Sequence, residues 1–399
     1  MNLDLIRRLS IPAETRVVLC VLDGLGGLPG PRGRTELDMA STPHLDRLAR
    51  EGAIGQTLPA GHGITVGSGP GHMALFGLDP LEFDIGRGVL EATGIDFEVG
   101  PNDVAARGNL CTVDGDGNIT DRRAGRVATE ITAEIAQQLG AIKLPGVEVF
   151  VGAVREHRFI LVLRGEGLSA AVTETDPQVE GEPPLPVEAI DATASRTADL
   201  LNQFVAEARE LIKDRDQANH LTLRGWSTRP SLPQIPELWK LRAAACTVYP
   251  MYRGLARLVG MESIDGGNSL RTQYEALERH WDDYDFFFVH YKPTDAAGED
   301  GDFDRKVEAI AEFDRQLPQL LALKPDVLIV VGDHSTPATL AAHSWHPVPL
   351  LISGATVRPD AARGFTELQC MTGGIGTIPA AELLPIAFAH AGRLAKYGA

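Results

Sequence analysis

Ser68 is the first residue of this chain whose surroundings suggest chemistry. It stands in "TVGSGPGHMALFGLDP" (residues 65–80), among three glycines and a proline that disfavour the interior of a strand or helix. We therefore expect a tight loop followed by a short helix over residues 72–77. A serine at that junction faces the positive end of a helix dipole, where anions bind. The alternative is a Gly-rich turn in which Ser68 only caps the helix.

Carboxylates and an imidazole follow three apolar segments elsewhere in the chain. The segments are "RVVLCVLDG" (16–24), "YDFFFVHYKPTD" (284–295) and "DVLIVVGDHST" (326–336). Continuous apolar runs with β-branched residues predict strands that are covered on both faces. Asp23 ends the first segment, Asp295 ends the second, and Asp333 and His334 lie near the end of the third. Because α/β sheets place their sites at the carboxyl ends of strands, these residues are candidates for one site.

Two further polar residues extend this set. Glu299 follows Asp295 at a spacing of four, which aligns two carboxylates if the segment is helical, and His343 follows His334 after nine residues. Oxygen and imidazole ligands without thiolates suit Mn²⁺ or Mg²⁺, with Zn²⁺ as the alternative. Taken singly, each residue reads as a turn or surface residue. Their shared position after predicted core strands is what indicates a metal site.

Three common motifs are excluded. The dinucleotide-binding pattern Gly-x-Gly-x-x-Gly, started at Gly24, has Pro29 at its last position. A P-loop fails because no lysine precedes Ser68, and the hydrolase elbow Gly-x-Ser-x-Gly fails because Val66 and Pro70 occupy its glycine positions. An acidic residue directly after a buried strand is better suited to holding a hard cation.

Strands and amphipathic helices alternate at both ends of the chain, which predicts an α/β fold with a largely parallel sheet flanked by helices. For example, "STPHLDRLAREG" (41–52) predicts a helix capped by Ser41 or Thr42 and stopped by Gly52. The middle of the chain instead carries hairpin turns such as "DGDGN" and a long helix near 191–212. We expect a discontinuous α/β domain, residues 1–84 and 226–399, interrupted by a smaller α+β domain at 85–225.

The composition limits the classes of function. The 399 residues are 44% hydrophobic and carry a net charge of −17, which argues against general nucleic-acid or anionic-membrane binding. No apolar run approaches the roughly 20 residues of a membrane helix, and the first residues do not read as a secretory signal. Four widely spaced cysteines fit a reducing cytoplasm. We expect a cytoplasmic protein that acts on a small molecule.

The order of the motifs resembles the alkaline phosphatase superfamily and, within it, the cofactor-independent phosphoglycerate mutases of the archaeal type. The resemblance rests on Asp-Gly after the first strand, Gly-Ser before a short helix, "VHYKPTDAAGEDG", "GDHSTP" and "AHSWHPVP". It extends over nearly the whole chain through "DRRAGR", "HRFILVLRGEGLS" and "YRGLARLVGM". It implies metal-dependent interconversion of 3-phosphoglycerate and 2-phosphoglycerate, a step of glycolysis and gluconeogenesis, without 2,3-bisphosphoglycerate.

The resemblance also implies roles for individual residues. Ser68 would be the nucleophile that becomes phosphoserine. Two divalent metal ions would be bound, the first by Asp23, Ser68, Asp333 and His334, and the second by Asp295, Glu299 and His343. The residues implied to bind the substrate are His62, Arg107, Arg122, Arg126 and Arg253.

The chain departs from the family pattern at two positions. Many family members carry histidine where this chain has Glu299, so we expect a harder metal at the second position. Aspartate is common where His346 stands, and His346 remains the alternative to Glu299 as a ligand.

The same motifs would serve a metal-dependent phosphatase or another phosphomutase of the superfamily. A non-catalytic protein that binds a phosphorylated ligand is the remaining alternative. A mutase must keep water out while phosphoserine persists, and the inserted domain would do so as a substrate-binding lid.

Overall fold

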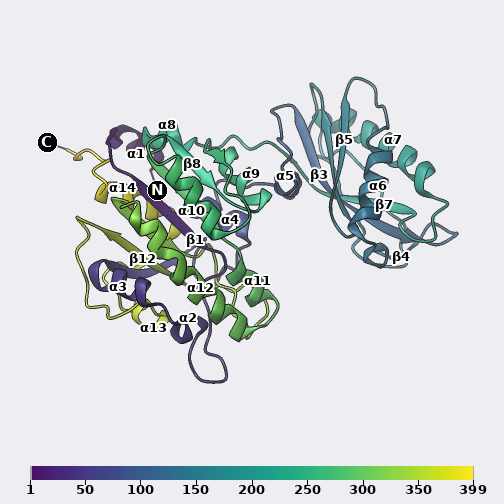
Figure 1. The fold of residues 1–399 in the computed structure, drawn as a ribbon. Coiled ribbons are helices and arrows are strands. Elements are labelled where there is room, and N and C mark those ends of the chain that lie inside the picture. The colour runs from purple at the N-terminus through teal and green to yellow at the C-terminus, as the bar shows by residue number, and fades with distance from the viewer. Residues whose placement is uncertain (1, 399) are drawn as a thin grey trace. The chain divides into compact units, whose positions relative to one another are not determined.

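The computed structural model describes residues 2–398, which form two compact units (Figure 1). Unit 1 contains the chain up to Asp84 and again from Leu232, and unit 2 contains Ile85–Ser231. The second boundary therefore lies at 231, where the sequence analysis placed it at 225. Unit 1 is assembled from both ends of the chain, and unit 2 is one continuous segment.

Unit 1 is built on an 8-stranded sheet in which neighbouring strands run parallel, except that β12 is antiparallel to both of its neighbours. In spatial order the strands are β13 (Gly376–Pro379), β2 (Ala53–Leu58), β12 (Val348–Gly354), β11 (Val327–Val331), β1 (Val17–Leu22), β10 (Phe286–Tyr291), β8 (Ala243–Cys246) and β9 (Glu262–Ile264). The three predicted strands are confirmed as β1, β10 and β11, and they lie side by side.

The sheet is central because its strands are apolar on both faces. Every residue of β1 is buried, and alternate residues point to opposite faces. On one face, Val18 and its neighbours pack into a core with α3 (Pro43–Glu51), α10 (Leu270–Arg279) and α12 (Phe303–Ala322). On the other face, Phe286 and Phe288 of β10 contact rings that follow or belong to α4 (Ser68–Leu75) and α14 (Leu383–His390). Helices on both faces confirm the predicted α/β fold class.

The helix predicted over 41–52 is confirmed as α3, which begins at Pro43 after Thr42 and ends before Gly52. The remaining helices of unit 1 are α1 (Leu3–Leu9), α2 (Glu36–Met39), α8 (Ile235–Trp239), α9 (Pro250–Leu258), α11 (Pro293–Glu299), α13 (Glu367–Cys370) and the 3₁₀ turn η3 (Ala380–Glu382). No helix within residues 2–398 is both long and apolar enough to cross a membrane.

Unit 2 has a 5-stranded antiparallel sheet centred on β3 (Asp103–Val113). Its other strands are β4 (Ile119–Asp121), β5 (Glu148–Arg155), β6 (Arg158–Arg164) and β7 (His220–Thr228), and its helices are α5 (Arg87–Gly94), α6 (Thr129–Leu139) and α7 (Ser195–Ile212), with 3₁₀ turns η1 (Ala124–Arg126) and η2 (Ala192–Ala194). A core of its own lies between this sheet and helices α6 and α7. The predicted hairpin at "DGDGN" joins β3 to β4.

Lys306 of α12 is fully buried and joins two loops at the carboxyl edge of the large sheet. Its Nζ donates hydrogen bonds to the carbonyls of Gly24 (2.9 Å), Gly26 (2.9 Å) and Thr336 (2.8 Å). The first two carbonyls follow β1 and the third follows β11. The lysine thus fixes the loops that carry Asp23 and His334 relative to each other.

Replacing Lys306 with methionine should lower the free energy of unfolding by about 3 kcal/mol, because three buried carbonyls lose their donor. Urea denaturation measures the change. The matched control is Lys324→Met at an exposed position after the same helix, which should change stability by less than about 0.5 kcal/mol. Equal stability of the two variants would show that Lys306 does not hold these loops.

Candidate active site

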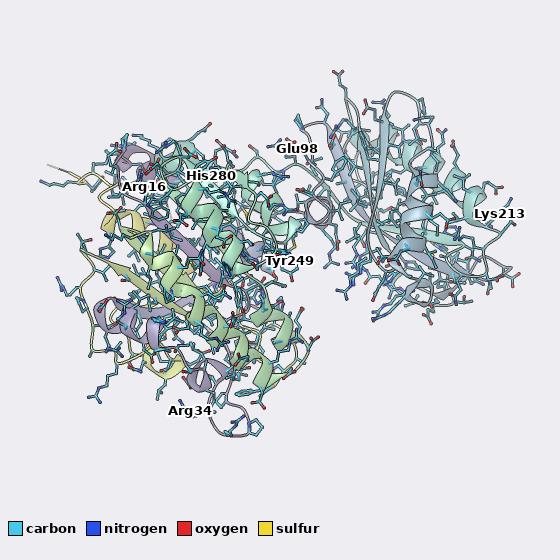
Figure 2. The ribbon with its side chains drawn as sticks, in the orientation of Figure 1. Arg16, Arg34, Glu98, Lys213, Tyr249 and His280 are labelled. Carbon is cyan, nitrogen blue, oxygen red and sulfur yellow. The ribbon has the colours of Figure 1, made fainter. Side chains whose placement is uncertain are left out.

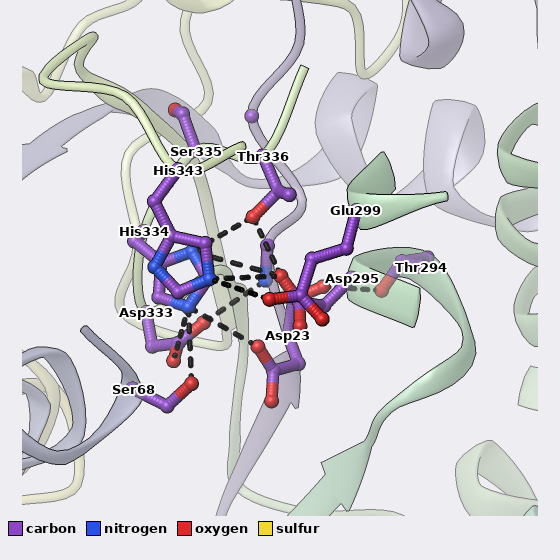
Figure 3. A network of polar contacts seen from close by, with 12 residues as sticks. Asp23, Ser68, Thr294, Asp295, Glu299, Asp333, His334, Ser335, Thr336 and His343 are labelled. Atoms are coloured by element: carbon purple, nitrogen blue, oxygen red, sulfur yellow. Dashed lines mark hydrogen bonds and ion pairs between the residues drawn. The ribbon is translucent and has the colours of Figure 1, made fainter. Parts of the chain in front are cut away.

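The carboxyl ends of β1, β10 and β11 bring the predicted acidic residues and histidine together. The three strands are parallel and in register, so the residues that follow them meet at one edge of the sheet. Asp23, Asp295 and Asp333 are fully buried, and His334 is 1% exposed. Figure 3 shows these side chains converging, with Ser68 on one side and Glu299 on the other.

Ser68 is the first residue of α4, so the expectation that the helix starts only at His72 was wrong. Pro70 is tolerated because the first turn of a helix has N–H groups without intrahelical acceptors. Gly71 is required by close approach, since a Cβ there would lie 2.5 Å from the Asp333 carbonyl oxygen. Gly71 therefore lets the start of the helix pack closely against the loop that follows β11.

The first candidate metal group consists of Asp23, Asp333 and His334, whose ligand atoms lie within 4.8 Å of one another. His334 Nε2 lies 3.3 Å from Asp23 Oδ1, 3.3 Å from Asp333 Oδ2 and 3.2 Å from Ser68 Oγ. Within the described residues, Asp23 Oδ1 and Asp333 Oδ2 are buried and have no hydrogen-bond partner. Buried carboxylate oxygens without partners are costly unless a cation satisfies them, so this donor set fits a divalent metal ion.

The electrostatics of His334 also indicate that the first group requires a positive charge. Burial disfavours a charged imidazole, but the carboxylates of Asp333 and Asp23 raise the pKa of His334 to about 9. Without a metal ion, a proton on the ring would supply the positive charge that these carboxylates require.

The second candidate metal group consists of Asp295, His334 and His343, so the structure places His334 in both groups. Asp295 and Glu299 lie on α11, where their spacing of four is helical. His343 Nε2 lies 3.5 Å from Asp295 Oδ1 and 3.5 Å from Glu299 Oε1. The rings of His334 and His343 stack with centroids 3.8 Å apart. Glu299 is not a member of this group; it lies beside His343 with 54% of its side chain exposed.

Glu299→Ala is expected to lose the ion at the second group and most activity, because that ion would keep only Asp295, His343 and the His334 ring that it shares with the first group. Glu299→His should restore binding and shift the preference toward softer ions such as Zn²⁺. Metal content of the purified variants, measured after dialysis against Mn²⁺, provides the readout.

Asp300→Ala is the control for Glu299→Ala, since it removes the same charge from the neighbouring position, where the carboxylate pairs with Arg305. It should retain both ions. Full metal content in Glu299→Ala would make Glu299 an ordinary surface acid.

His346, the alternative ligand, lies elsewhere. Its Nδ1 is 3.0 Å from Ser344 Oγ, and its ring stacks on Trp345. It lines a cavity of about 610 Å³ together with Gly27 and Glu367. His346 is absent from both metal groups found in the described residues.

Three residues that the sequence analysis did not single out surround the remaining oxygen of Asp23. Asp23 Oδ2 accepts hydrogen bonds from the Tyr252 hydroxyl, from His290 Nε2 (2.9 Å) and from Lys292 Nζ (3.2 Å). Burial lowers the pKa of His290 to about 4, so this ring is neutral and donates from Nε2. His290 and Lys292 stand in the quoted "VHYKPTD", where their closeness to Asp295 was the available signal.

His72, four residues after Ser68, connects Ser68 to Asp333 of the first group. Its Nδ1 lies 2.8 Å from the Ser68 carbonyl oxygen and 3.1 Å from Asp333 Oδ2, and its side chain is fully buried. The histidine thus packs the helix start against the loop after β11.

The residues expected to bind substrate are divided between the units. In unit 1, His62 is exposed between β2 and α4, and Arg253 of α9 donates to the Val248 carbonyl. In unit 2, Arg107 of β3 lies 3.4 Å from Glu91, Arg122 forms a bidentate ion pair with Asp176, and Arg126 is exposed in η1.

Unit 2 carries further arginines that the sequence analysis missed. Arg224 of β7 is paired in register with Arg107 and lies 3.5 Å from Asp176. Burial and the charges of Arg158, Arg87 and Arg224 lower the pKa of Arg107, while Glu91 opposes this. Arg107, Arg158 and Arg224 therefore lie on three neighbouring strands, β3, β6 and β7, and Arg87 of α5 joins their basic cluster. The alternation of side chains along "EHRFI" and "LTLRGW" was the signal that could have found them.

The α/β sheet of unit 1 gathers a serine, aspartates and histidines at its carboxyl edge, which is where enzymes of the α/β class place their active sites. A family model described as 2,3-bisphosphoglycerate-independent phosphoglycerate mutase matches residues 49–218. The chain belongs to the family of 2,3-bisphosphoglycerate-independent phosphoglycerate mutases, because it is also 50% identical over 396 residues to a curated relative from Thermotoga neapolitana, covering 99% of this chain and 98% of the relative. That relative is named "Probable 2,3-bisphosphoglycerate-independent phosphoglycerate mutase".

Other comparisons agree. A relative of the same name from Thermus thermophilus is 49% identical over 400 residues, covering 99% of this chain and 98% of the relative. A solved cofactor-independent phosphoglycerate mutase from Thermoplasma acidophilum is similar with a TM-score of 0.77 and 30% identity, covering 94% of this chain and 100% of that one. A Pyrococcus horikoshii protein reaches a TM-score of 0.82 at 29% identity over 97% of this chain and 100% of that one. The predicted family and its enzyme class, an isomerase, are confirmed.

Proposed function

We propose that this chain interconverts 3-phosphoglycerate and 2-phosphoglycerate, with Ser68 as the nucleophile. The observation that carries the assignment to Ser68 is its place at the helix start, with Oγ 3.2 Å from His334 Nε2 and beside buried carboxylate oxygens that accept no hydrogen bond. Family membership supports the reaction.

In this proposal Asp23, Ser68, Asp333 and His334 hold one divalent ion, and Asp295, Glu299 and His343 hold a second. Such ions favour the ionised serine and neutralise phosphoryl oxygens. The oxygen and imidazole donors are suited to Mn²⁺ or Mg²⁺, with Zn²⁺ as the alternative.

The phosphoryl group is then transferred in two steps. Ser68 Oγ bonds to phosphorus as the bond from phosphorus to the 3-oxygen of the substrate breaks, and the serine proton passes to that oxygen. The 2-hydroxyl of the retained glycerate next attacks the phosphoserine, and its proton returns to Ser68 Oγ as 2-phosphoglycerate forms. Positioning and charge stabilisation are what phosphoryl transfer mainly requires.

The basic residues are proposed to bind the substrate anions. His62 and Arg253 belong to unit 1, and Arg107, Arg122 and Arg126 belong to unit 2. Against a net charge of −17, an anionic substrate needs such a local concentration of positive charge. We further propose that unit 2 excludes water from the phosphoserine as a lid.

The experiment that tests the reaction follows 3-phosphoglycerate by ³¹P NMR with metal-free protein, with and without added Mn²⁺. The expected product is 2-phosphoglycerate, formed only with the metal. Stoichiometric release of phosphate and glycerate would assign a phosphatase instead. Bound metal with no turnover would assign a non-catalytic binding protein.

A further inference from the structure

Lys292 lies between the two candidate metal groups. Its Nζ is 3.2 Å from Asp23 Oδ2, in the first group, and 2.5 Å from Asp295 Oδ2, in the second. His334 also reaches both carboxylates, with Nε2 3.3 Å from Asp23 Oδ1 and Nδ1 4.0 Å from Asp295 Oδ1, whereas Lys292 contacts the Oδ2 atom of each. The Lys292 side chain is 20% exposed.

The two carboxylates share one orientation around this lysine. Each turns Oδ2 toward Lys292 and Oδ1 toward a histidine: Asp23 Oδ1 lies 3.3 Å from His334 Nε2, and Asp295 Oδ1 lies 3.5 Å from His343 Nε2. The Lys292 ammonium group therefore donates hydrogen bonds to the two Oδ2 atoms, which face away from His334 and His343. The Oδ1 atoms remain directed into the metal groups.

The local chain makes this arrangement rigid. Lys292 is the single residue between β10, which ends at Tyr291, and α11, which begins at Pro293. The Asp295 backbone N–H donates to the Lys292 carbonyl at 3.1 Å, so lysine and aspartate lie on one helical turn. Pro293 fixes φ at the first helical position.

We propose that Lys292 is a positioning residue that couples the two metal groups, by holding Oδ2 of both Asp23 and Asp295 so that each presents Oδ1 to its own ion. The inference rests on the proposed function, because it assumes that both groups bind metal. It concerns how the ligands are held and not which residues ligate.

A positioning role and a simple charge effect predict opposite signs. By Coulomb's law alone, removing an ammonium group near two cation sites should tighten the binding of divalent ions. Removing a partner that orients the ligands typically weakens metal binding 10–100-fold. The direction of the change in affinity therefore separates the two explanations.

The test measures Mn²⁺ binding to metal-free protein by titration calorimetry and by electron paramagnetic resonance, which reports coupling between neighbouring Mn²⁺ ions. Wild type should bind two ions. Lys292→Met should weaken both by about tenfold or more. Tyr252→Phe, which removes a donor that reaches Asp23 but not Asp295, should weaken one ion only. Lys213→Met is the control for charge, since this lysine is exposed at the end of α7 in unit 2 (Figure 2).

Lys292→Gln keeps a hydrogen-bond donor without the charge and guards against a folding defect in Lys292→Met. It should bind both ions more tightly than the methionine variant does. Unchanged or tighter binding of both ions in Lys292→Met, or weakening of only one, would overturn the proposal. Failure of the wild-type protein to bind two ions would instead refute the proposed function, in which the site holds two divalent ions.

Discussion

Ser68→Ala is expected to abolish the mutase reaction, with activity at least about 10⁴-fold below wild type. The reason is that Ser68 is the proposed nucleophile, whose Oγ is the hydroxyl oxygen beside His334 Nε2 in the first metal group. The rate of 2-phosphoglycerate formation from 3-phosphoglycerate with Mn²⁺ measures the loss. Acid-quenching wild type during turnover should also yield a phosphorylated peptide that contains residues 65–80.

Ser353→Ala is the control for Ser68→Ala. Ser353 pairs with Leu328 near the start of β11, whereas Asp333 follows the end of that strand. The control should keep full activity. Turnover by Ser68→Ala above the stated limit, or an unphosphorylated peptide from wild type, would contradict a serine-linked mechanism.

The second large effect is expected from His334→Ala, which should lose the ion held with Asp23 and weaken the other. Its Nε2 faces the first group, and its ring stacks on His343 of the second, so one substitution disturbs both. Loss of several kcal/mol of transition-state stabilisation corresponds to about a 10³-fold fall in activity. Metal content and the rate of 2-phosphoglycerate formation are the measurements.

His343→Ala provides the comparison, since it should lose only the ion held with Asp295. His280→Ala, at an exposed histidine paired with Asp283, should behave as wild type. If His334→Ala and His343→Ala lost the same single ion, the division into two groups would be incorrect.

The strands β1, β10 and β11 were predicted correctly because they are apolar on both faces, and a continuous apolar run can be recognised without knowing which elements pack against it. The position of Asp23, Asp295 and Asp333 at one edge followed from parallel strands alone. The fold class and the gathering of these three carboxylates were therefore predictable from the sequence.

Other features depend on packing that the sequence does not display. The start of α4 at Ser68 was missed because glycine propensity disfavours helix, while the approach of Gly71 to the Asp333 carbonyl requires it. Lys292 was overlooked because a lysine after a strand reads as a surface charge until Asp23, 269 residues away, is seen to accept its hydrogen bond. The pairing of Arg107 with Arg224 depends on the order of strands in unit 2, which no local pattern reveals.

The discontinuous build of unit 1 has a consequence for synthesis on the ribosome. Strand β1 emerges early, but both of its neighbours, β10 and β11, lie more than 260 residues later, so it has no partner until the chain has been synthesised as far as Tyr291. Unit 2 is continuous and has its own core, so it can fold before β10 and β11 are available to pair with β1. The apolar segment "VVLCVL" is then an exposed strand in the nascent chain, a target for chaperones that bind extended hydrophobic peptides.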